Sequence, residues 1–335
     1  MAWEIAVFRR TRLSNYQNCL RLFDAYADFA PLWERALLSA YVGFGPPLAR
    51  VFGANTKTVW SQAEALIDDL FAVSQMTPQQ VVSSLRGYMK LKQEADHHLL
   101  FSEARELIYD QDFYPLVTHF TFAFQSSAIA RMRFVKRVAA AMSFTNAAVA
   151  DLGCGSGAML CEVLRSKPGW TGYGLDISEA SICYAHRLAA HKGLAGRAAF
   201  QQGSITQLPF ASSSIDLVIA SEVIEHLPEP AAAFREIARV LAPGGFFALT
   251  VPIGSHTPAH LNSPGSAEEF HELCQEVGLV VQSLTSKWHL TFGDDPRHLF
   301  AVAQLRTQSE PATQSVYSLL PPQISSAASN GTVSS

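Results

Sequence analysis

A run of glycines that could bind a nucleotide follows a strand-like segment in the middle of the chain. Gly153, Gly155 and Gly157 alternate with small residues and come soon after Asp151. Such glycines let the backbone approach a ligand closely, and a helix that starts behind them offers free amides. Asp176 ends the next apolar run, at the spacing at which an acid commonly binds a ribose diol. The turn alone also fits a dinucleotide fingerprint, so a nicotinamide cofactor and a structural turn without ligand stay open.

Motifs further along the chain separate these alternatives. They are Gln202-Gly203-Ser204-Ile205, then Ser221-Glu222-Val223-Ile224-Glu225-His226-Leu227 at the end of an apolar run, and then Ala242-Pro243-Gly244-Gly245. Together with the glycine turn, and in this order and spacing, they resemble the class I S-adenosylmethionine-dependent methyltransferases. The resemblance covers about residues 140–305. No single motif is specific, but the series is.

The resemblance implies a role for each matching position, with S-adenosylmethionine as the cofactor. The amino-acid part of the cofactor is implied to lie on Asp151, Gly153, Gly155 and Gly157, and its ribose hydroxyls on Asp176. The adenine is implied to pack on Ile177, with Gly203, Ser204 and Ile205 along its far edge, and the reaction centre to face Ser221 and Glu222. Many members of the family have Asp where this chain has Ser204, which weakens the adenine contact at that position.

Methyl transfer needs the acceptor in line with the carbon–sulfur bond, and a base only where the acceptor must lose a proton. His226, with Glu225 beside it, follows the expected fourth strand where such a base could lie. A position at a helix start without chemical role is the alternative for His226. Glu222, Glu225 and His226 also resemble the metal site of certain ubiquinone-pathway and small-RNA methyltransferases, which implies Mg²⁺ or Mn²⁺ as a second alternative. Only His256 or His260 could be guessed as a fourth ligand.

The elements that must position these residues alternate between strand and helix. This pattern predicts an α/β fold with a doubly wound, mostly parallel seven-stranded sheet that ends in an antiparallel hairpin, preceded by an all-α domain. Strands are expected at 147–152, 170–176, 198–203, 215–220, 245–251, 279–284 and 298–305, and helices at 159–166, 179–192, 230–241 and 267–277. The last two strands are joined by Gly293-Asp294-Asp295-Pro296, too short for a crossover helix, so they should pair antiparallel.

Residues 1–140 have helical periodicity, clearest at 59–71, and Thr77 to Gln80 match a helix start with a capping box. This all-helical domain is expected to cap the cofactor cleft and bind the acceptor, or to form a homodimer interface. Its aromatic residues are expected to be mostly core, with a minority facing the site: Phe113, Tyr114, Phe120, Phe122 and Phe124. Residues 141–306 form the expected cofactor-binding domain, and the Ser- and Pro-rich residues 307–335 a disordered tail.

Composition limits the partners. The net charge is −4 and no basic block recurs, so nucleic acid is not an expected partner. The five cysteines form no Cys-x-x-Cys pair and suggest free thiols, and Cys154 within the glycine turn is expected to have no catalytic role. Neither a signal peptide nor a membrane span is evident, which predicts a cytoplasmic location.

The sequence therefore predicts a methyltransferase for a small, partly apolar metabolite, with oxygen preferred over nitrogen or carbon as acceptor, in specialised biosynthesis. The preference for oxygen depends only on His226 as a possible base. A non-enzymatic protein that senses S-adenosylmethionine and binds a partner is the alternative from another class.

Overall fold

The fold is described from a computed structural model over residues 56–98, 109, 111–124, 126–252, 267–288 and 297–306. Its central feature is a seven-stranded sheet of order β3-β2-β1-β4-β5-β7-β6. The strands are β1 (Ala148–Leu152), β2 (Thr171–Asp176), β3 (Ala198–Gln202), β4 (Ile215–Ser221), β5 (Leu241–Pro252), β6 (Leu279–Trp288) and β7 (Arg297–Leu305). The first five pair in parallel, whereas β7 is antiparallel to both β5 and β6. The predicted fold class and the antiparallel hairpin are confirmed.

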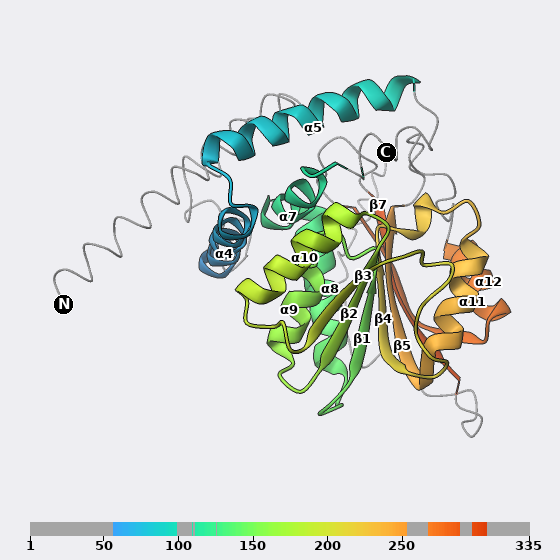
Figure 1. Ribbon diagram of the computed structural model, residues 1–335. Helices are drawn as coiled ribbons and strands as arrows, with labels where there is room; N and C mark the ends of the chain where they lie inside the picture. Colours follow the sequence, from blue (N-terminus) through green and yellow to red (C-terminus); the bar gives the residue numbers. More distant parts are fainter. Residues whose placement is uncertain are drawn as a thin grey trace, which may run out of the picture.

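Helices cover both faces of this sheet (Figure 1). One face carries α8 (Ser126–Ala141), α9 (Ala158–Ser166) and α10 (Glu179–His191), and the other carries α11 (Pro230–Val240) and α12 (Ala267–Glu276). A second layer lies outside α10, where α4 (Thr56–Ser74) and α7 (Tyr114–Phe124) pack on it and α5 (Pro78–His98) packs on α7. No helix in the described ranges is both long and apolar enough to cross a membrane.

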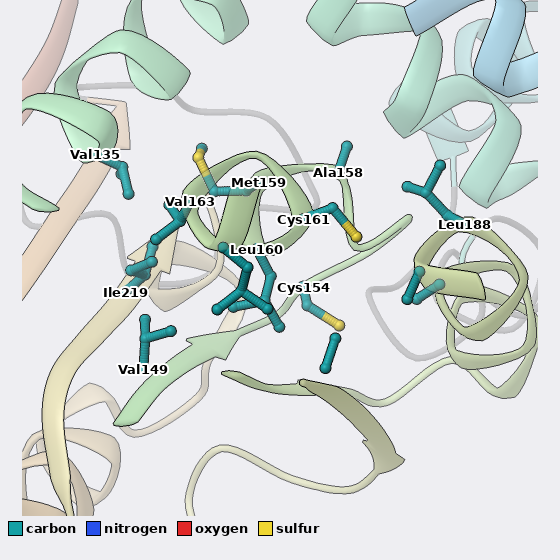
Figure 2. Close-up of a cluster of buried hydrophobic side chains, with 14 of the residues drawn as sticks. Val135, Val149, Cys154, Ala158, Met159, Leu160, Cys161, Val163, Leu188 and Ile219 are labelled. Atoms are coloured by element: carbon teal, nitrogen blue, oxygen red, sulfur yellow. The ribbon is translucent and has the colours of Figure 1, made fainter. Parts of the chain in front are cut away.

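The helical layers share one hydrophobic core with the sheet. Figure 2 shows the inner part of this core, where Val135 of α8 lies near Met159 and Val163 of α9, above Val149 of β1 and Ile219 of β4. The same cluster continues outward to Leu66, Ile67 and Leu70 of α4 and to Leu116 and Phe120 of α7. The burial of α7 against this core fixes its position above the end of β1.

The local signals in the sequence match the element ends. Gln80 N donates to Thr77 Oγ1 at 3.3 Å and Thr77 N donates to Gln80 Oε1 at 2.9 Å, so the predicted capping box starts α5. β5 begins four residues earlier than expected and β6 ends four residues later, whereas the other predicted boundaries differ by at most one residue. Leu241 ends the expected helix, but it pairs with Ile215 and so begins β5, ahead of a register shift in that pair. A short 3₁₀ turn, η1 (Ile224–His226), follows β4, outside the helices and strands predicted from the sequence.

The four described cysteines, Cys154, Cys161, Cys183 and Cys274, are free thiols. Several predicted features lie outside the described residues: residues 1–55 of the expected helical domain, the turn at 293–296, His256, His260, Cys19, the side chain of Phe124 and the tail at 307–335.

Candidate functional site

The glycine turn joins β1 to α9 at the carboxyl edge of the sheet. Gly153, Gly155 and Gly157 have φ angles of +69°, +50° and +74°, in the region that only glycine occupies without strain. The turn is fixed to the neighbouring strand because Gly153 N and Cys154 N both donate to Leu175 O, at 2.8 and 3.0 Å. Its backbone is therefore held in place at the strand ends, where ligands bind in doubly wound sheets.

Two carboxyl groups border this turn. Asp151 is 2% exposed, and its Oδ2 has no hydrogen-bond partner among the described residues. Burial, followed by the charge of Asp176, raises the pKa of Asp151 to about 8. Asp176 Oδ2 accepts a hydrogen bond from Gly155 N at 2.8 Å, and its Oδ1 accepts one from Ser178 N at 2.9 Å. The acid at the end of β2 is thus aimed at the glycine turn, as a ribose-binding group must be.

The expected adenine residues follow β2 and β3. Ile177 is 38% exposed, which is unusual for a large apolar side chain and leaves a surface on which a ring can pack. Gly203 N donates to Asp176 O at 2.9 Å, so the two loops are adjacent. Ser204 is exposed and its Oγ lies 2.8 Å from Thr206 Oγ1. Ile205 is only 5% exposed and belongs to the hydrophobic core under this loop.

The end of β4 carries a polar group that the sequence only partly indicated. Ser221 Oγ lies 2.9 Å from Thr250 Oγ1 of β5, and Arg131 Nη1 of α8 donates to it at 3.5 Å. Glu222 has a φ of +56°, a strained value for this residue type, and its Oε2 lies 3.2 Å from His298 Nε2 of β7. A strained backbone persists only where the surrounding packing holds it in place, and such residues cluster at functional sites.

Glu225 and His226 lie in η1, directly after this group. Glu225 is fully buried, and neither of its carboxyl oxygens has a hydrogen-bond partner in the described part of the chain. Burial, followed by the charge of Glu222, raises the pKa of Glu225 well above its usual value. His226 Nε2 lies 4.0 Å from Glu225 Oε1, and its ring packs edge-on against Tyr109 at 5.7 Å.

The three residues considered as metal ligands do not converge on one point. Glu222 is bonded to His298, and His226 packs on Tyr109. Over the residues described, no group of three or more His, Cys, Asp or Glu side chains has an arrangement that could hold a metal ion. The described residues therefore give no support to the metal alternative, and His256 and His260 lie outside them.

Helix α7 covers the glycine turn from the helical side. A methyl group added at Gly155 would lie 3.4 Å from Thr118 Oγ1, so the two are in near contact. Tyr114 lies close enough to Asp176 and Glu225 for their charges to add to the burial that raises its pKa. The other described aromatics expected here are core: Phe120 is 3% exposed, and Phe113 and Phe122 pack against the same cluster.

Four residues of the site had no signal in the sequence analysis: Tyr109, Thr118, Arg131 and His298. Tyr109, Thr118 and Arg131 come from the region predicted to be all-helical and His298 from the last expected strand, and none lies in a motif. Cys154 lies within the turn, but burial raises the pKa of its thiol well above the usual value, so it is not an activated nucleophile.

A separate cavity of about 540 Å³ lies between α10 and α7. Its lining includes Asp112, Leu116, Glu179, Cys183 and Arg187, and none of the residues singled out from the sequence motifs. It lies beside the first turns of α10, whereas the polar group described above is at the end of β4.

Part of this chain is similar to known proteins. A family model described as a methyltransferase domain matches residues 150–249, which include the glycine turn and the ends of β1, β2, β3 and β4. The chain is 38% identical over 96 residues to a probable chloroplastic tocopherol O-methyltransferase of Oryza sativa subsp. japonica, covering 29% of this chain and 26% of that protein.

Two fungal relatives extend the comparison. Sterol 24-C-methyltransferase ERG6B of Gibberella zeae is 37% identical over 102 residues, covering 30% of this chain and 26% of that protein. The O-methyltransferase resE of Aspergillus sclerotiorum is 29% identical over 153 residues, covering 45% and 56%. The chain thus spans about a quarter of the length of two of these relatives and just over half of the third.

Proposed function

We propose that this chain, in which residues 150–249 form a methyltransferase domain, transfers a methyl group from S-adenosylmethionine to a small, partly apolar molecule. The observation that carries the proposal is the positive-φ glycine turn with the carboxyl of Asp176 aimed at it from the next strand. The match to the family model supports the same cofactor. The tocopherol and sterol methyltransferases among the relatives favour a lipophilic acceptor.

The residues at the carboxyl edge fit this cofactor. Asp151 Oδ2 is a buried carboxyl oxygen without a hydrogen-bond partner among the described residues, and the cofactor's ammonium group would complete it. Asp176 would hold the ribose hydroxyls, and the exposed side chain of Ile177 would pack on the adenine, with Gly203 and Ser204 at its edge. When bound, the cofactor supplies a methyl group on a positively charged sulfur.

The chain itself contributes position and exclusion of water. Tyr114 and Thr118 of α7 lie over the glycine turn, so the helical region closes the cleft from above. A closed cleft holds the acceptor in line with the bond to be broken and strengthens electrostatic interactions inside it. Covering the cleft is therefore the role we assign to the helical region.

We assign oxygen as the acceptor atom and His226 as the base. His226 is only partly buried, lies after β4 at the acceptor side, and has its ring packed edge-on against Tyr109, with Glu225 Oε1 4.0 Å from its Nε2. Positioned general bases contribute about 10²- to 10⁴-fold to rate. His226→Gln should lower turnover by at least about 100-fold and leave binding of S-adenosylhomocysteine unchanged. An unchanged turnover would remove the basis for both assignments.

The first experiment is calorimetric titration of the whole protein with S-adenosylhomocysteine, with NADH as the competing ligand. We expect micromolar binding of S-adenosylhomocysteine, no comparable binding of NADH, and loss of binding in Asp176→Ala. Glu276→Ala is the matched control, because this exposed acid lies on α12 on the other side of the sheet.

Absence of binding by the wild type would contradict the proposal. Binding without turnover across a panel of lipophilic alcohols, phenols and hydroxy acids would instead favour a protein that senses the cofactor and binds a partner.

A further inference from the structure

A half-buried arginine lies at the end of β4 and has few hydrogen-bond partners among the described residues. Arg131 reaches this edge from α8, and its Nη1 donates to Ser221 Oγ at 3.5 Å. That long contact is its only hydrogen bond among the described residues, and its buried Nε has no acceptor there. A guanidinium carries five donors, and 3.5 Å is at the limit of a hydrogen bond. Within the part of the chain that the structure describes, most of the donors of Arg131 are therefore unused.

The neighbouring acids do not pair with this arginine. The carboxylate of Glu222 is bonded to His298. Glu225 lies close enough for the charge of Arg131 to act on it, yet in the described part of the chain neither of its oxygens has a hydrogen-bond partner. A buried polar group without a partner is destabilising, so such groups are normally hydrogen-bonded to protein, water or a ligand. Here a donor group and an acceptor group are both incomplete at one place.

The surroundings fit a small organic molecule. The guanidinium lies 5.7 Å from the ring centre of Phe122, which gives the place an apolar wall. The paired hydroxyls of Ser221 and Thr250 border it at the strand ends. This is the carboxyl edge that also carries the glycine turn, so a molecule bound at Arg131 would be beside the cofactor.

We propose that Arg131 binds an anionic oxygen of the methyl acceptor, so that the acceptors of this chain are small oxyacids, and carboxylic acids above all. Guanidinium is the side chain best suited to carboxylates because it offers parallel donors. The inference rests on the proposed function and names the substrate class of that site; Arg131 acts as its specificity-determining residue.

The test uses the whole protein saturated with S-adenosylhomocysteine. The probes are hydroxybenzoates and medium-chain 3-hydroxyalkanoates, each paired with its neutral amide, and binding is measured by saturation-transfer NMR and calorimetry. We expect at least one acid to bind about tenfold or more tightly than its amide, as loss of a charged hydrogen bond implies. Arg131→Met should abolish this preference without changing the affinity for S-adenosylhomocysteine, and Arg131→Lys should keep part of it.

Arg133→Met is the matched control, because Arg133 lies on the same helix but is exposed to solvent, and it should bind the acids as the wild type does. Equal binding of acids and amides would overturn the inference, and so would failure of every acid to bind a protein that binds S-adenosylhomocysteine. Failure to bind S-adenosylhomocysteine itself would refute the proposed function and this inference with it.

Discussion

Two glycines with nearly the same backbone angle separate the cost of strain from the cost of close packing. Gly157 ends the glycine turn with φ +74°, and an added Cβ would lie 2.8 Å from Ala185 Cβ and 2.9 Å from the ring of Phe200. Gly193, after α10, has φ +68° and no atom within 4 Å of an added Cβ. The first position is restricted by both its angle and its neighbours, the second by its angle alone.

We expect Gly193→Ala to lower the free energy of unfolding by about 1 kcal/mol, the cost of a left-handed backbone for a residue with a Cβ. Gly157→Ala should lower it by about 2 kcal/mol more, because overpacking adds to strain. Urea unfolding of the two variants and the wild type measures both values. Equal losses in the two variants would mean that the turn relaxes around the added methyl group.

Asp151 predicts a dependence of stability on pH in the absence of cofactor. Its pKa is raised to about 8 in the folded state, against about 4 in the unfolded chain. Between these values the folded state holds a proton that the unfolded state has lost, so the contribution of Asp151 to stability falls as the pH rises from about 4 to about 8. Asp151→Asn removes this ionisation.

The melting temperature of Asp151→Asn should therefore rise relative to the wild type as the pH is raised from 5 to 8. One pKa unit corresponds to about 1.4 kcal/mol. Raising the pH from 5 to 8 should therefore increase the free energy of unfolding of Asp151→Asn, relative to that of the wild type, by at least about 2 kcal/mol. Glu276→Gln, at an exposed position on α12, should run parallel to the wild type. Parallel curves for Asp151→Asn as well would show that this carboxyl is ionised in the folded protein.

At the scale of elements, one neutral histidine lies buried between α7 and α4. His119 is fully buried, and its Nε2 lies 2.8 Å from Leu66 O, so it joins the two helices. Burial lowers its pKa to about 4. The unfolded chain takes up a proton near pH 6.5 whereas the folded state does not, so stability falls as the pH drops from about 6.5 towards 4.

We expect the wild type to lose about 2 kcal/mol between pH 7 and pH 5 through this residue, at about 1.4 kcal/mol per pH unit below 6.5. His119→Gln should be less stable at pH 7 but should lose less over that interval, as measured by urea unfolding at each pH. His271→Gln, at an exposed position on α12, serves as the control and should follow the wild type. An unchanged slope in His119→Gln would mean that another group titrates.

At the scale of the whole molecule, the helical region and the sheet act on one site. Thr118 of α7 lies on the glycine turn, and Tyr109 lies on His226 of η1. Binding of S-adenosylhomocysteine should therefore slow amide hydrogen exchange in α7 and η1 by about tenfold or more, since a covered helix opens less often. Exchange in α12 should not change, because α12 covers the opposite face. Protection of the glycine turn without protection of α7 would contradict a covering role for the helical region.

Features that depend on interactions between near neighbours in the chain could be predicted from the sequence alone. Positive φ angles require glycines at 153, 155 and 157, the Thr77 and Gln80 spacing starts a helix, and alternating strand and helix periodicity fixes the sheet. The sequence also indicated Asp176, through its spacing after the glycine turn, and Asp151, through the family resemblance. These features involve neighbours in the chain or a repeating topology, and both can be read from residue order.

The residues that surround the reaction centre could not be predicted from the sequence, because tertiary packing brings them together. Arg131 and Ser221 are 90 positions apart, and His298 and Glu222 are 76 apart, yet each pair is in contact. Ile205 turned out to be core, while Ile177 remained exposed. No local rule gives such contacts, because they depend on how α8 packs against the sheet and on the pairing of β7 with β5. That packing is set by apolar surface buried throughout the core, to which many side chains contribute without a recognisable motif.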